Sequence, residues 1–200
     1  MKKAIREPQQ ERSIEKKNKI IDASYVLFSE NGYYSTGTSD IAKKAGVSTG
    51  IVYGYFEDKR DILLYVLKIY IDRVTAPLID YMKKMKAPVE FKKVLPEFLD
   101  LVTKTHKENA HLHNTLHSLA ASDKDVSGEF IALEDRITEH VSNRLTELGV
   151  NAEHISEKVH IAMNLMQSFS HEAIFDRHKY IDYEAMRQEV LDMLAKLFSE

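Results

Sequence analysis

Hydroxyl-bearing residues gather between positions 36 and 59, where their spacing would let them contact a nucleic acid. Ser48 opens a short segment of helical periodicity, where a serine can cap the helix or offer its hydroxyl and N–H to a phosphate. Thr49 follows it and could touch a thymine methyl group or bond a base edge. The segment from Ser48 to Glu57 holds no arginine or lysine that could bond a guanine in bidentate geometry. Sequence choice would therefore rest on few side-chain atoms and partly on DNA shape.

Histidines are a second group of residues that could bind a ligand or a metal ion. All nine lie after residue 105. His113 and His117 are four residues apart, a spacing that lets both imidazoles bind one metal ion from a helix face. The third ligand would have to be a distant residue such as His106, His171 or Glu172. We favour a polar-edged pocket for a small effector over a metal site, and we predict neither a metal nor a cofactor. The residues expected to line this pocket are Tyr70, Phe98, His113, His117, Met163 and Gln167.

A helical metal-dependent enzyme is the alternative from another class of function. His171-Glu172, and His160 near Glu157, could belong to a metal–carboxylate site. The sequence shows no nucleophile motif, no glycine-rich phosphate loop and no cysteine pair for redox chemistry. We therefore expect no enzyme. A constitutive DNA-architectural protein is a third possibility, which the large second half of the chain disfavours.

The hydroxyl groups would be positioned by two short helices joined by a tight turn at Gly46-Val47. This arrangement predicts a helix-turn-helix, whose second helix enters a DNA major groove. Further helices are expected over the rest of the chain, because glycine and proline are few and no alternating strand pattern persists. The first helix carries Ile20 to Phe28 and ends at Asn31-Gly32, and a fourth starts at Asp58 and runs towards Pro77 or a little beyond. The remaining segments are predicted near 89–107, 109–121, 126–148, 152–176 and 183–198, which makes the fold all-α.

Composition and charge exclude several classes of protein. The 200 residues are 44% hydrophobic and 30% charged, with no cysteine. No apolar run approaches the roughly 20 residues of a membrane span, and the start shows no secretory pattern, so we predict a cytoplasmic protein. The net charge is −3, but residues 1–70 hold 12 Lys and Arg against 9 Asp and Glu, which leaves this part basic. A basic head on an acidic body is typical of a chain that meets phosphates at one end.

The run from Ile20 to Leu63 resembles the N-terminal domain of the TetR family of bacterial transcriptional regulators. The resemblance covers the first third of the chain only. The residues that carry it are Ile20 to Phe28, Gly32-Tyr33, Thr36, Asp40-Ile41-Ala42, Ala45 to Ser48, Gly50, Tyr53, Tyr55-Phe56, Lys59 and Ile62-Leu63.

The resemblance implies a dimeric repressor that binds a double-stranded, palindromic DNA operator and is released by an unknown small-molecule effector. The residues expected to contact DNA are Thr38, Ser39, Ser48, Thr49, Gly50, Tyr53, Tyr55 and Lys59. Two of these positions depart from the family pattern: Thr49 stands where many members have a lysine, and Thr38 where Val or Ile is common. Gly50 is explained either by close approach of DNA or by close packing on the preceding helix, and the resemblance favours DNA.

Three regions are expected along the chain. Residues 1–13, with Lys2, Lys3, Arg6 and Arg12, form a basic arm that either follows the minor groove or is a simple tail. Residues 14–60 form the helix-turn-helix domain, and residues 61–200 form a helical domain for effector binding and dimerisation. The broad apolar faces of the segments near 152–176 and 183–198 suit a four-helix homodimer interface, although an intramolecular core explains them equally.

Overall fold

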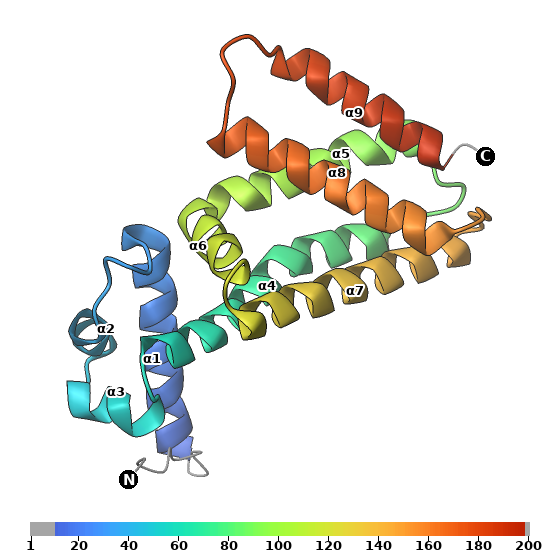
Figure 1. Cartoon of the computed structure of the whole chain (residues 1–200). Helices are drawn as coiled ribbons and strands as arrows, with labels where there is room; N and C mark the ends of the chain where they lie inside the picture. Colours follow the sequence, from blue (N-terminus) through green and yellow to red (C-terminus); the bar gives the residue numbers. More distant parts are fainter. Residues whose placement is uncertain (1–10, 199–200) are drawn as a thin grey trace. The chain divides into compact units, whose positions relative to one another are not determined.

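The computed structural model describes residues 11–198, which contain helices and no strand. The helices are α1 (Glu11–Asn31), α2 (Thr38–Ala45), α3 (Thr49–Tyr55), α4 (Lys59–Lys84), α5 (Phe91–Glu108), α6 (Ala110–Ala120), α7 (Lys124–Glu147), α8 (Ile155–Phe175) and α9 (Tyr183–Leu197) (Figure 1). The predicted all-α fold is therefore confirmed. The predicted helix boundaries agree to within a few residues, except that α4 continues through Pro77 to Lys84.

Most of the basic arm predicted for residues 1–13, namely residues 1–10, lies outside the described residues. Its last three residues, 11–13, already form the first turn of α1. The basic arm as a whole stays a prediction.

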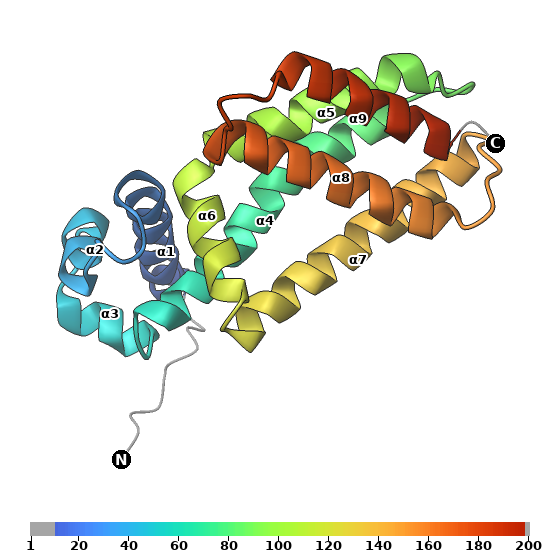
Figure 2. The ribbon, with the colours of Figure 1, turned by 45° about the horizontal axis from the view of Figure 1, so that its top comes forward.

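The chain divides into two compact units, and the boundary passes through α4, between residues 72 and 73 rather than between 60 and 61. The first unit holds residues 11–72 and 109–128, and the second holds residues 73–108 and 129–198. The first unit is thus larger than the domain predicted for residues 14–60, because α6 packs on α1 and brings the turn before α7 with it. Figure 2 shows α6 beside α1.

In the first unit, α1, α2 and α3 pack around a small apolar core. The side chains of Ile20, Phe28, Ile41, Val52 and Phe56 are fully buried. Gly46 ends α2 with a φ of 69°, a left-handed conformation that glycine adopts at little cost. The N–H of Val47 then donates to the carbonyl of Ala42 at 3.0 Å and closes the turn. The short helices are therefore fixed by burial on one side and by this turn at their junction.

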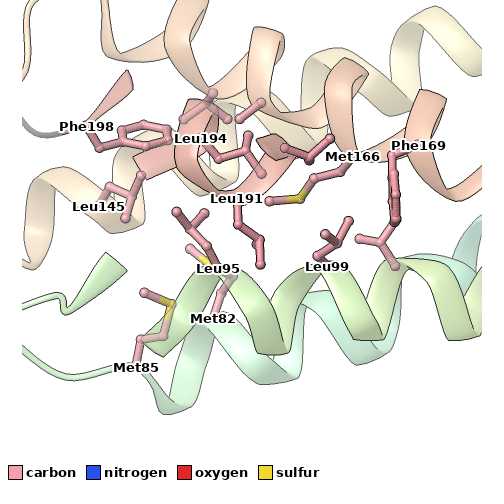
Figure 3. Close-up of a cluster of buried hydrophobic side chains, with 14 of the residues drawn as sticks. Met82, Met85, Leu95, Leu99, Leu145, Met166, Phe169, Leu191, Leu194 and Phe198 are labelled. Atoms are coloured by element: carbon pink, nitrogen blue, oxygen red, sulfur yellow. The ribbon is translucent and has the colours of Figure 1, made fainter. Parts of the chain in front are cut away.

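The second unit is built on a larger apolar core in which α5, α8 and α9 pack on one another (Figures 1 and 2). Figure 3 shows this core, to which α4 and α7 also contribute. Among its members are Met82, Leu99, Leu145, Met166 and Leu194. The apolar faces of α8 and α9 thus belong largely to an intramolecular core, which accounts for most of the stripes that suggested a dimer interface. Ile161 on α8 and Met193 on α9 remain about half exposed.

Two glycine substitutions compare the stability contribution of the glycine in the turn, Gly46, with that of a glycine in the following helix, Gly54. Gly46→Ala should lower the free energy of unfolding by about 1 kcal/mol, because alanine is strained in the left-handed region. Gly54→Ala should raise it by about 0.5–1 kcal/mol, because a Cβ there meets no atom of residues 11–198 within 4 Å and alanine favours helix. Urea unfolding measures both, and equal effects of the two variants would contradict the role given to Gly46.

Candidate DNA-binding surface

The exposed side of the helix-turn-helix brings together hydroxyl groups from two helices. The Thr38 Oγ1 at the start of α2 lies 3.0 Å from the Tyr53 hydroxyl in the middle of α3, at hydrogen-bond distance. Tyr53 is 50% exposed, although an aromatic ring of this size would normally be buried. Ser39 and Thr49 are exposed as well, whereas Tyr55 at the end of α3 is half-buried. These side chains are polar and uncharged, and their hydroxyl groups can donate to phosphate or to base edges.

Ser48 occupies the N-cap position of α3, as predicted, but its side chain does not cap the helix in the described structure. Backbone hydrogen bonds explain why the hydroxyl is not needed as a cap. The N–H groups of Ile51 and Val52 both point to the carbonyl of Ser48, at 2.9 and 3.3 Å, so the turn is closed without the hydroxyl. The Ser48 side chain is exposed beside Thr49 instead.

Gly50 leaves the backbone of α3 uncovered. A Cβ added there would meet only the Ser48 Oγ, at 4.0 Å, among the atoms of residues 11–198. The alternative that Gly50 permits close packing on α2 is therefore not supported. An open backbone on an exposed helix face is what close approach by a nucleic acid requires.

Lys59 differs from the freely exposed lysine that a phosphate contact suggests. Its ammonium donates to the carbonyls of Tyr33 at 2.8 Å and Thr36 at 3.0 Å, and lies 4.3 Å from the centre of the Tyr33 ring. Partial burial lowers the pKa of Lys59. Because two of three N–H donors serve the loop between α1 and α2, Lys59 fastens that loop to the first turn of α4.

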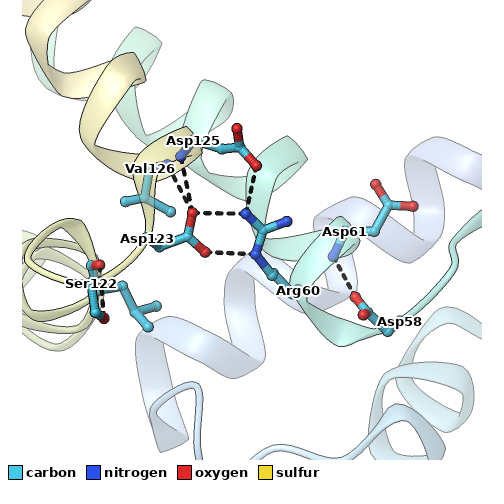
Figure 4. Close-up of polar contacts among 8 residues, drawn as sticks. Asp58, Arg60, Asp61, Ser122, Asp123, Asp125 and Val126 are labelled. Atoms are coloured by element: carbon cyan, nitrogen blue, oxygen red, sulfur yellow. Dashed lines mark hydrogen bonds and ion pairs between the residues drawn. The ribbon is translucent and has the colours of Figure 1, made fainter.

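The first turn of α4 is also held by neighbouring acidic groups. Asp58 Oδ1 accepts the N–H of Asp61 at 2.8 Å, and Asp61 Oδ2 accepts the N–H of Glu57 at 3.1 Å, which confirms the predicted start of the helix. Arg60 forms an ion pair with Asp123 and Asp125, which sequence reasoning missed because 63 and 65 residues separate the partners. Figure 4 shows the Arg60 ion pair and the hydrogen bond between Asp58 and Asp61. The Arg60 guanidinium lowers the pKa of Asp123 to about 2.

Lys17 is a second basic residue that sequence reasoning missed. Its ammonium on α1 donates to the Tyr65 hydroxyl of α4 at 2.8 Å and lies 4.1 Å from the centre of the Tyr65 ring. No sequence signal reveals this contact, because 48 residues separate Lys17 from Tyr65.

The residues predicted for an effector pocket fall into both units. Tyr70, His113 and His117 belong to the first, where the Tyr70 hydroxyl lies 2.7 Å from His113 Nδ1 and the two histidine rings are 4.2 Å apart between centres. His113 is buried and His117 is exposed. Burial raises the pKa of Tyr70. Phe98, Met163 and Gln167 belong to the second unit, where Phe98 packs on Tyr81.

Two properties of residues 11–198 concern the alternatives of a metal site and a membrane protein. They contain no group of three or more His, Asp or Glu side chains placed to hold a metal ion. No helix of this part of the chain is both long enough and apolar enough to cross a membrane.

Comparison with known proteins decides the family. Residues 20–66 match the family described as bacterial regulatory proteins, tetR family. This part of the chain is a TetR-family N-terminal domain. The fold of this chain is similar to that of a protein from Syntrophomonas wolfei that is described as a TetR-family transcriptional regulator. The TM-score is 0.66 and the sequence identity 26%, over 94% of this chain and 96% of that one.

Two proteins that are similar to this chain in sequence also carry the word regulator in their names. The transcriptional regulator HbdR of Aromatoleum is 43% identical over 76 residues, which is 38% of this chain and 33% of that protein. The fatty acid metabolism regulator protein of Bacillus subtilis is 36% identical over 87 residues, 44% of this chain and 41% of that protein. The aligned segment thus spans between a third and two fifths of these relatives.

Removing the Lys59 ammonium tests its role as a fastener. Lys59→Met should lower the free energy of unfolding by about 1–3 kcal/mol, because two charge-assisted hydrogen bonds to backbone carbonyls are lost. Lys68→Met is the matched control on the exposed side of the same helix and should change it by less than about 0.5 kcal/mol. Urea unfolding followed by circular dichroism measures both, and similar values for the two variants would show that Lys59 is not structural.

Proposed function

We propose that this chain binds duplex DNA in a sequence-specific manner through the exposed surface of α2 and α3. The observation that carries the proposal is the paired hydroxyl groups of Thr38 and Tyr53 beside the open backbone of Gly50. Hydroxyl groups and backbone N–H groups are common phosphate ligands, and a helix with an uncovered backbone can lie close to the groove. The predicted contacts of Ser39, Ser48, Thr49, Tyr55 and Lys59 remain part of this proposal.

The mode of action that we propose is a homodimeric repressor released by a small-molecule effector, which the family resemblance favours. Recognition helices about 34–36 Å apart would fit successive major grooves of a palindromic operator. Ile161 and Met193 are exposed apolar side chains on the two helices predicted to form the dimer interface, where association would cover them. An effector can release DNA only if it prefers a state that binds the operator less well.

Selection of bound duplexes from a random pool tests the proposal most broadly. We expect an enriched palindromic sequence with half-sites about one helical turn apart, because two identical heads would bind it. Repeating the selection with a metabolite panel, with fatty acids included in view of the Bacillus subtilis relative's name, should reveal an effector by loss of enrichment. A protein that enriches no sequence at low salt would contradict specific DNA binding.

Thr49 offers a narrower test of base readout. Thr49→Ala should reduce discrimination at one base pair of the selected site by about 1 kcal/mol, roughly fivefold, because its methyl and hydroxyl groups would no longer meet the base edge. Ser35→Ala, which removes an exposed hydroxyl before α2, should leave the preference unchanged. Competition binding with single-base variants of the site measures this, and uniform weakening on every sequence would make Thr49 a backbone contact.

A further inference from the structure

Arg60 makes the most extensive ion-pair contact described in the first unit. Its Nε donates to Asp123 Oδ2 at 2.6 Å and its Nη2 to Asp123 Oδ1 at 2.7 Å, while Nη2 also donates to Asp125 Oδ2 at 2.6 Å (Figure 4). Only a planar guanidinium can grip one carboxylate through two parallel bonds in this way. The bidentate geometry makes this contact more specific than a single ion pair between flexible side chains.

Asp123 is itself fixed by the backbone of the turn between α6 and α7. Its Oδ1 accepts the N–H groups of Asp125 at 3.0 Å and Val126 at 3.3 Å, so the carboxylate caps α7 while it binds Arg60. The Asp123 side chain is only 15% exposed, whereas Asp125 is 68% exposed. The carboxylate is thus held in the orientation that Arg60 needs before the two meet.

The position of Arg60 gives this ion pair a consequence for the DNA-binding surface. Arg60 follows Lys59 directly, and Lys59 fastens the loop that leads into α2. The turn that binds Arg60 closes α6, whose first turn is tied to α1 and α4 by Tyr25–Asn109 at 2.8 Å and Tyr70–His113 at 2.7 Å. One turn of α4 is thereby joined to both the loop before α2 and the end of α6.

We propose that Arg60 is a positioning residue for DNA binding: its ion pair with Asp123 and Asp125 holds the first turn of α4, and with it the Lys59-fastened loop, in the arrangement that binds duplex. The inference rests on the proposed DNA-binding function. The alternative interpretation is that Arg60, a basic residue beside Lys59, contacts a phosphate directly. Two carboxylates already neutralise this guanidinium, so a phosphate would have to displace them.

The two readings give opposite signs for one substitution. Asp123→Asn removes the negative charge and keeps an oxygen that can still cap α7. If Arg60 were a phosphate contact, this change would free it and tighten DNA binding. If Arg60 acts by positioning, the same change should weaken binding about fivefold or more, although the protein has become more positive.

The experiment measures affinity for the selected duplex by fluorescence anisotropy, with the full chain, across a salt series. Asp22→Asn is the matched control, since it removes the same charge from an exposed site on α1 of the same unit. We expect Asp123→Asn to bind the duplex about fivefold more weakly than wild type, and Asp22→Asn to bind it with unchanged or slightly higher affinity. Arg60→Lys should also bind more weakly than wild type, because lysine cannot form the two parallel hydrogen bonds to Asp123. The slope of log affinity against log salt should be unchanged in Arg60→Gln, whereas loss of a phosphate contact would reduce it by about 1.

Tighter binding by Asp123→Asn, equal affinity in both Asp→Asn variants, or a reduced slope in Arg60→Gln would overturn the proposal. A wild-type protein that binds no duplex would refute the DNA-binding function instead, so the two failures are distinguishable. If Asp123→Asn fails to fold, Asp125→Asn gives the same sign test at the more exposed partner.

Discussion

The first turn of α4 joins two separate parts of the first unit. Two adjacent cations there have partners in different parts of the first unit: Lys59 binds carbonyls of the loop before α2, and Arg60 binds carboxylates of the turn before α7. Charge-assisted hydrogen bonds of this kind are stronger and more directional than neutral ones. These bonds tie the loop before α2 and the turn before α7 to the same turn of α4.

The resulting surface is short of charge where DNA would meet it. No lysine or arginine lies on α3, and the cations that follow it are engaged within the protein. Affinity would then depend on well-placed hydroxyl and backbone groups, of which the Thr38–Tyr53 pair is the clearest. Groups held in place before binding lose less conformational entropy when the complex forms, which compensates in part for the missing charge.

The local features of this head were predictable from sequence, and the long-range ones were not. Gly46, the buried Ile41 and Val52, and the Asp58 start of α4 follow rules that act within a few residues. The partners of Lys59 and Arg60 could not be foreseen, because 23 to 65 residues separate each pair and no periodicity connects them. The apolar faces of α8 and α9 were visible, but whether they pack within one chain or between two is a question of tertiary packing.

A crystal structure of the full chain bound to its selected duplex tests the central claim most directly. The account predicts that Thr38 and Tyr53 lie on phosphates or base edges, that the Gly50 backbone contacts the DNA, and that the Arg60 guanidinium remains on Asp123. A complex in which Arg60 has left Asp123 for a phosphate, or in which α3 lies away from the major groove, would contradict it.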